Sequence, residues 1–111
     1  MSPRDQDYVV DILSAARLIR MFLMDRERDG FETDLMCQSA VIRQLEIIGE
    51  ATKRLSITFK ANHPDIPWQK MAGMRDILIH AYDAVDLNEV WNASTQSIPQ
   101  LIQQLEPLVS P

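Results

Sequence analysis

Apolar residues recur every three or four positions along most of this chain, which is the spacing of amphipathic helices. The pattern predicts a first helix from about Asp5 to Asp25 and a second, the longest, from about Asp34 to Lys60. Strand-like alternation is almost absent. The side chains expected on the buried faces of these two helices are Tyr8, Val9, Ile12, Ala16, Ile19, Phe22, Leu23, Met36, Ala40, Val41, Leu45, Ile48, Ala51, Thr52, Leu55 and Phe59.

The first helix is expected to end before Asp29 and Gly30, a pair of residues that is typical of turns and predicts a loop. Three methionines, Met21, Met24 and Met36, surround this connection. Filling of the core is the favoured explanation for them, because methionine adapts to irregular gaps. A helix-on-helix surface in a dimer is the alternative.

Two prolines, Pro64 and Pro67, interrupt the helical pattern after the second helix, since proline cannot continue a helix. Pro67 suits the entry to a third helix, which we expect from Trp68 to about His80 or Tyr82. The sequence therefore predicts that residues 62–67 separate the second helix from the third.

A fourth helix is expected from Asp86, because Asp86 and Glu89 have the spacing of a capping box. Pro99 is expected to divide it from a last short helix, Gln100 to Leu108. The whole pattern predicts an all-α fold with one domain over residues 1–111. We expect an antiparallel bundle of four to five helices, because the connections are short.

Composition narrows the class of protein. The chain has 46% hydrophobic and 24% charged residues, which is ordinary for a globular protein. A single cysteine, Cys37, excludes an intramolecular disulfide framework and fits a reducing cytoplasm. No apolar run reaches the ~20 residues that span a bilayer, and no signal-peptide pattern is present. We therefore expect a cytoplasmic protein with no membrane partner.

The formal net charge of −5 has the wrong sign for a protein that grips long nucleic acid through its phosphates. A local basic groove can still bind nucleic acid within an acidic whole. On the second helix, Arg43, Lys53 and Arg54 could form the walls of such a groove, although solvated surface charge is the commoner role. Glu46 and Glu50 could pair with Lys53 or Arg54, which is favoured over acid–base chemistry.

One segment, Met74 to Tyr82, concentrates the chemistry of the chain. Helical geometry advances about 100° per residue, so Arg75 and Tyr82 share one stripe while Asp76 and His80 share the next. An imidazole can move a proton to or from a ribose hydroxyl, and a guanidinium can hold a phosphate. Asp76 could orient the His80 ring and favour its charged form. This set could cleave a phosphodiester without metal.

Each of these residues also has a structural explanation. A histidine near a helix end is often a cap or is solvated, and Arg75 with Asp76 could be surface charge. A tyrosine such as Tyr82 is often packed with its hydroxyl satisfied. On spacing alone, the structural explanations are the commoner ones. A metal site built from His80, Asp76, Asp83 and His63 is weaker still, because the histidine spacing is poor for a metal.

The motif Arg75-x4-His80-x-Tyr82 resembles that of the HepT-like toxins, small helical ribonucleases of the HEPN superfamily. Three further segments resemble parts of the same family, and the likeness runs from about Asp7 to Leu108. These segments are Ile47 to Leu55, Trp68 to Asp76, and Asp86 to Trp91.

The resemblance implies an endoribonuclease that needs neither metal nor cofactor, acting on RNA as the toxin of a type II-like toxin–antitoxin system. Arg75 and His80 would be the catalytic pair, and Asp76 would hold the supporting polar position. Family members are homodimers with both motifs at a shared cleft. Their partner is an MntA-like minimal nucleotidyltransferase antitoxin, which transfers AMP from ATP to the tyrosine that corresponds to Tyr82. The alternative is a non-catalytic helical subunit that binds such a nucleotidyltransferase.

Four other residues on this chain have packing explanations. Gly49 can permit a close approach between helices, and Cys37 is most simply a small core residue. Trp68 and Trp91 are expected to anchor the packing rather than to stack on bases.

Overall fold

The fold is all-α in the computed structural model, which describes residues 1–80 and 85–109, with only the backbone at His80. Within these ranges no strand occurs, so the predicted fold class is confirmed. Four helices have 12 or more residues and form the bundle. The elements in order are α1 (Pro3–Phe22), α2 (Arg28–Glu32), α3 (Leu35–Arg54), α4 (Ile57–Asn62), α5 (Trp68–His80), α6 (Leu87–Asn92), a π-helical turn (Ala93–Ser97) and α7 (Ile98–Val109).

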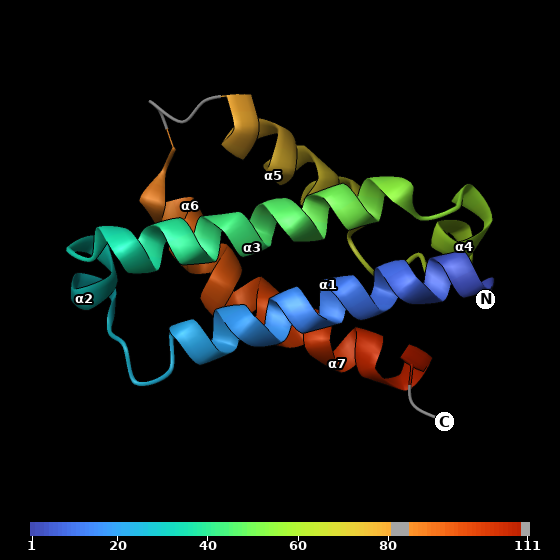
Figure 1. Ribbon diagram of the computed structural model, residues 1–111, viewed down its shortest axis with the longest axis horizontal. Coiled ribbons are helices and arrows are strands. Elements are labelled where there is room, and N and C mark those ends of the chain that lie inside the picture. Colours follow the sequence, from blue (N-terminus) through green and yellow to red (C-terminus); the bar gives the residue numbers. More distant parts are fainter. Residues whose placement is uncertain (81–84, 110–111) are drawn as a thin grey trace.

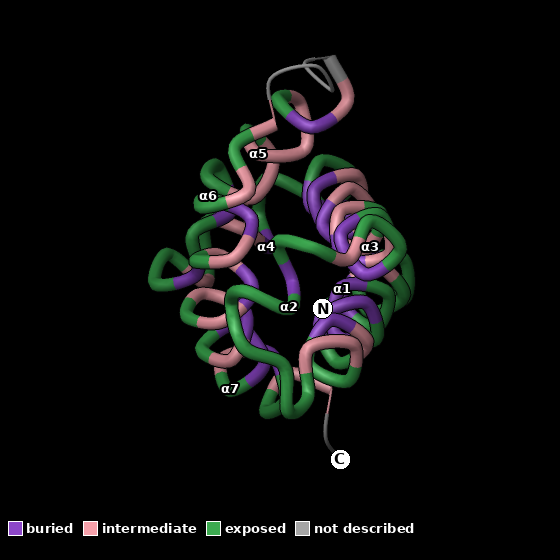
Figure 2. Tube along the Cα trace, turned by 90° about the vertical axis from the view of Figure 1, so that its left-hand side faces the viewer, coloured by how far each residue is buried: buried purple, intermediate pink, exposed green. Residues whose placement is uncertain are grey.

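The two longest helices, α1 and α3, lie side by side and run in opposite directions (Figure 1). Helix α5 packs on α3, while α7 packs on α1. Buried positions turn inward between these helices (Figure 2). The most deeply buried large side chains are Phe31, Ile12, Ile19, Ile48, Leu105, Val9, Val41 and Val90. No helix in the described ranges combines the length and apolarity needed to cross a membrane.

A buried carboxylate joins the start of α1 to the start of α4. Asp5 is 5% exposed, and it accepts hydrogen bonds from the backbone N–H of Ser56 at 2.9 Å and from its hydroxyl at 2.7 Å. Ser56 in turn caps α4, because its Oγ accepts a bond from the Phe59 N–H at 3.1 Å. These bonds, led by the one from the Ser56 backbone, hold the pKa of Asp5 below its usual value.

This link corrects the prediction of one continuous helix from Asp34 to Lys60. The helix breaks at Leu55 and Ser56, which both have extended backbone. The Ser56 N–H donates to Asp5 instead of to a carbonyl of the preceding turn. The break therefore has a tertiary cause, a carboxylate 51 residues away in sequence.

The expected division at Pro99 is also wrong, because the chain stays helical from Leu87 to Val109. A π-helical turn leads directly into α7, and the Ile98 N–H donates to the carbonyl of Ala93, five residues back. Pro99 then falls in the first turn of α7, where its missing N–H costs little. The fourth helix does begin at its predicted cap, since the Asp86 carboxylate accepts from the Asn88 N–H at 2.8 Å.

The first connection differs from its prediction in two ways. A short helix, α2, includes Asp29 and Gly30, where a loop was expected. The methionines are exposed rather than buried, at 61% for Met21, 68% for Met24 and 82% for Met36. Here Cys37 faces inward in place of Met36, with 6% exposure. The core-filling explanation for the methionines is therefore wrong.

Candidate functional site

Helix α5 lies unusually close to α3, and Gly49 is the reason. A β-carbon added at Gly49 would stand 2.1 Å from Cβ of Arg75 and 2.9 Å from the backbone carbonyl oxygen of Met71. Only a residue without a side chain fits between the two helices at this point. The prediction that Gly49 permits a close approach is confirmed, and its neighbour in space is Arg75.

The start of α5 is anchored by Trp68, which is 7% exposed. Its indole N–H donates to the carbonyl of His63 at 3.0 Å, and its ring centre lies 5.8 Å from that of Phe59. Further along the helix, Leu78 is buried while Ile77 is 55% exposed. Trp68 is thus a packing anchor, as the sequence predicted, and it fixes the helix that carries Arg75.

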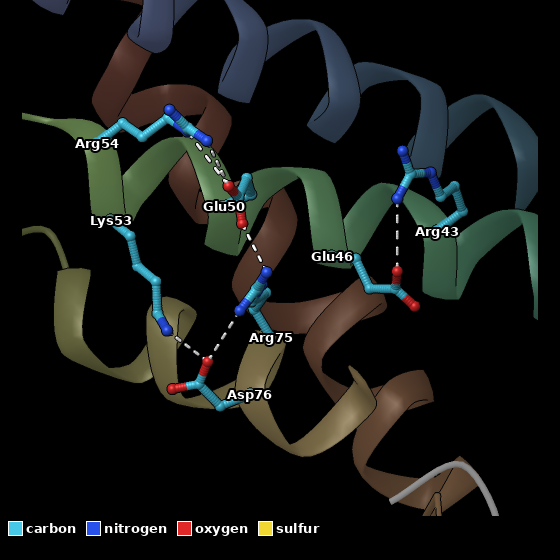
Figure 3. A network of polar contacts seen from close by, with 7 residues as sticks. All are labelled: Arg43, Glu46, Glu50, Lys53, Arg54, Arg75 and Asp76. Carbon is cyan, nitrogen blue, oxygen red and sulfur yellow. Dashed lines mark hydrogen bonds and ion pairs between the residues drawn. The ribbon is translucent and has the colours of Figure 1, made fainter. Parts of the chain in front are cut away.

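Two carboxylates from two helices hold the Arg75 guanidinium. One Nη atom lies 2.7 Å from Oε2 of Glu50 on α3, and the other lies 3.3 Å from Oδ1 of Asp76 on α5 (Figure 3). The Arg75 side chain is only 23% exposed, and its Nε is buried without a partner among the described residues. The guanidinium is therefore fixed in orientation and still has N–H groups to donate.

The same carboxylates bind two further cations, which extends the pairs into a network (Figure 3). Glu50 accepts from Arg54 at 3.0 Å and 3.2 Å, while Asp76 accepts from Lys53. The bonds from Arg54, followed by the charge of Arg75, lower the pKa of Glu50. Lys53 is the main cause of the lowered pKa of Asp76. Both carboxylates are thus held in their charged form.

Arg75 lies in the wall of an open pocket of about 350 Å³ formed by α1, α3 and α5. Arg43 and Arg54 line it from α3, together with Glu46 and Glu50. The expectation that Arg43 and Arg54 form walls beside the motif therefore agrees with the pocket. Lys53 does not line it, and its side chain is paired with Asp76.

The structure brings Arg75 and Asp76 together, although helical geometry had assigned them to separate stripes. His80 is the last residue of α5, and its side chain is outside the description. Tyr82 and Asp83 lie outside the described residues. In the described part of the chain, no three histidine, cysteine or acidic side chains gather as they would around a metal ion.

Sequence reasoning missed the contact between Glu50 and Arg75. It predicted the pair of Glu50 with Arg54, which is confirmed, but not the second cation on the same carboxylate. A signal was present in the adjacent Gly49, since a glycine within an amphipathic helix marks a place where another backbone comes close. The residue next to such a glycine is well placed to contact the approaching helix.

These features define a class: a small all-α protein with an arginine fixed at the edge of a pocket, suited to binding an anion such as phosphate. A family model described as "Ribonuclease HepT-like" matches residues 12–108. The chain therefore belongs to the HepT-like ribonuclease family. No solved structure matches the chain significantly.

Relatives with curated names agree with this family. The chain is 45% identical over 108 residues to "Probable ribonuclease HepT" of Thermococcus cleftensis, with 97% of this chain and 98% of that protein covered. It is 36% identical to a "Putative RNase" of Methanocaldococcus jannaschii, covering 96% and 98%. It is also 42% identical to a "Gamma-glutamylcyclotransferase and putative RNase" of the same organism, covering 88% of this chain but only 44% of that longer protein.

Proposed function

We propose that this chain is a metal-independent endoribonuclease in which Arg75 holds the scissile phosphate and His80 transfers protons. The observation that carries the proposal is the fixed guanidinium of Arg75 at the pocket edge, five residues before His80 on the same helix. The membership of the ribonuclease family supports it. A prearranged cation lowers the barrier because it meets the charge that develops on the phosphate without reorganising.

In the proposed reaction, the imidazole of His80 takes the proton of a ribose 2′-hydroxyl. The 2′ oxygen forms a bond to phosphorus, and the bond from phosphorus to the 5′ oxygen breaks. The products are a 2′,3′-cyclic phosphate and a 5′-hydroxyl, whose proton comes from a protonated histidine. In a homodimer, the second copy would supply that histidine.

Asp76 has the supporting role in this proposal. It binds Arg75 directly and Lys53 beside it, so it helps to fix the phosphate clamp. As a charged carboxylate on the same helix as His80, four residues before it, Asp76 would also favour the protonated form of the imidazole.

The biological role we propose is that of a toxin acting on cytoplasmic RNA, neutralised by a minimal nucleotidyltransferase antitoxin that transfers AMP to Tyr82. The motif Arg75-x4-His80-x-Tyr82 supports this role through its resemblance to the family's motif. An adenylate on Tyr82 would add a bulky negative group seven residues after Arg75 in the sequence. It would therefore compete with RNA for the phosphate clamp.

A homodimer belongs to the same proposal. Four exposed apolar side chains, of Met21, Met24, Leu35 and Met36, lie at the joined ends of α1 and α3 and would gain from burial. Exposed apolar surface near the ends of two helices is a candidate for contact with a second copy. Sedimentation of the purified protein at several concentrations tests for a dimer, and Met36→Lys should weaken one that uses this surface.

The direct test of the activity is RNA cleavage by the purified protein in excess EDTA. We expect the parent to cleave, and His80→Ala to lose most of the activity. His63→Ala is the matched control, since His63 is the only other histidine and its ring makes a tilted contact with Phe59. If His80→Ala cleaves as fast as the parent, the catalytic assignment is wrong. If the parent neither cleaves RNA nor slows growth, the non-catalytic binding subunit is the better description.

A further inference from the structure

The pocket beside Arg75 contains more than a phosphate clamp. Its volume of about 350 Å³ falls within the range of sites that hold small ligands, about 300–1,000 Å³. A phosphate held by Arg75 would fill only one edge of it. The rest of the pocket extends along α3, where the apolar side chains of Ile47 and Ala51 line it. It reaches α1, where Tyr8 lines it.

Tyr8 offers this pocket an aromatic surface. Its side chain is only partly buried, although it packs against the core. The guanidinium carbon of Arg4 lies 5.9 Å from the ring centre, at the outer limit of a cation–π contact. Arg4 is exposed in the first turn of α1, so a flat group could replace it on the ring. Nucleobases stack on tyrosine in this way in proteins that bind single-stranded nucleic acid.

The charges of the pocket favour a short ligand over a long polyanion. Its three arginines are accompanied by three carboxylates, of Asp11, Glu46 and Glu50. Arg43 binds Glu46 only at 3.5 Å, and its side chain is 68% exposed, so this pair can open for a phosphate. The carboxylates repel the dense phosphates of a duplex, but they can accept hydrogen bonds from base amino groups.

We infer that this pocket binds one unpaired nucleotide of the RNA, with its base against Tyr8 and a flanking phosphate near Arg54. The inference rests on the proposed ribonuclease function for the identity of the polymer, because the nucleotide held here neighbours the phosphate on Arg75. It assigns substrate binding to α1 and α3, outside the Arg-x4-His motif. It also predicts that the protein prefers single-stranded RNA.

The test is calorimetric binding of the four nucleoside 3′-monophosphates, which carry no bond for the protein to cleave. Tyr8→Leu removes the ring but keeps an apolar side chain, and we expect at least one nucleotide to bind about tenfold more weakly. Phe22→Leu is the matched control, since Phe22 is another partly buried aromatic residue on α1 and lies outside the pocket. Circular dichroism verifies that both variants are folded.

A second pair of variants tests the phosphate contact. Arg54→Gln removes a pocket cation that is paired with a glutamate one turn away. Arg28→Gln removes a similarly exposed arginine from an equivalent pair on α2. We expect only Arg54→Gln to weaken nucleotide binding several-fold.

The outcomes separate this inference from the proposed function. If Tyr8→Leu and Arg54→Gln bind nucleotides and cleave RNA as their controls do, the pocket inference is overturned while the ribonuclease remains. If the parent binds nucleotides through Tyr8 but does not cleave RNA, the pocket stands and the ribonuclease proposal fails. Equal affinity for a mononucleotide and for inorganic phosphate would also overturn the inference.

Discussion

Gly49 of α3 lies directly against Arg75 of α5, so that a β-carbon at position 49 would stand 2.1 Å from the Arg75 Cβ. The proposed phosphate clamp is thus positioned by the absence of a side chain on the neighbouring helix. This relationship makes Gly49 part of the support of the site, although it contributes no polar group to the network.

Gly49→Ala is therefore expected to destabilise the protein and to displace Arg75. The clash involves Cβ of Arg75 and a backbone carbonyl, so relief requires a shift of α5. We expect a loss of about 1–3 kcal/mol in the free energy of unfolding, measured with urea. RNA cleavage at a temperature where the variant is folded should fall at the same time.

Gly73→Ala is the control for this substitution. Gly73 is also within a helix, on α5, but nothing lies within 4 Å of a β-carbon added there. Alanine favours helix over glycine, so we expect a gain of up to about 1 kcal/mol. Equal stability of the two variants would contradict the close packing between α3 and α5.

Glu50→Gln should lower both KM and kcat for RNA cleavage. Loss of the charge frees Arg75 for RNA phosphate and so lowers KM, but it also loosens the guanidinium and lowers kcat, each by several-fold. Steady-state cleavage of a fluorescent RNA measures both constants.

Glu46→Gln is the matched variant, because Glu46 lines the same pocket and binds Arg43 rather than Arg75. We expect it to lower KM without lowering kcat. An unchanged kcat in Glu50→Gln would mean that Glu50 does not orient the clamp.

Asp5 is expected to make the stability of the protein depend on pH. Its pKa is lower in the folded protein than in the unfolded chain, so its stabilising effect is present above the unfolded pKa of about 3.9. That effect is lost as the pH falls through the folded pKa. Asp5→Asn should cost roughly 1–3 kcal/mol at pH 7 and flatten the acid dependence below about pH 4.

Urea unfolding at several pH values measures this dependence. Asp7→Asn is the control, since Asp7 is exposed on the same helix. If both variants keep the acid dependence of the parent, the link between Asp5 and Ser56 does not contribute to it.

Tyr82 is expected to accept AMP from the proposed antitoxin. Incubation with that partner and ATP should add ~329 Da per transferred group by mass spectrometry. Tyr82→Phe should abolish the gain, whereas Tyr8→Phe should retain it, because the chain has only these two tyrosines. The same gain in Tyr82→Phe would place the modification on another residue.

Local patterns predicted most of the helices but not the features that depend on contacts between distant segments. The helix cap at Asp86 and the close helix approach at Gly49 could be predicted from the sequence. Each has a signature in one residue or in a few neighbouring residues. The break at Ser56 could not be predicted, because its carboxylate partner comes from Asp5. The break predicted at Pro99 is absent because this proline follows a π-helical turn and falls in the first turn of α7.

In the candidate site, too, local features could be predicted and contacts between distant residues could not. The motif directed attention to Arg75 and Asp76, but helical spacing placed them on different stripes, and only the side-chain conformations bring them together. The contact of Glu50 with Arg75 joins two helices and has no local signature except the neighbouring Gly49. The methionines were expected in the core but are exposed. Residue type alone does not determine which side of a helical turn faces the core.

The network around Arg75 has a stoichiometric consequence. Among the described side chains, three cations, Arg54, Arg75 and Lys53, alternate with two carboxylates, Glu50 and Asp76, which leaves one positive charge in excess. One phosphodiester carries one negative charge, so a single RNA linkage would bring this group to electroneutrality. A group balanced in this way holds RNA without a large surplus of positive charge, and this would allow an acidic protein to act on RNA and then release it.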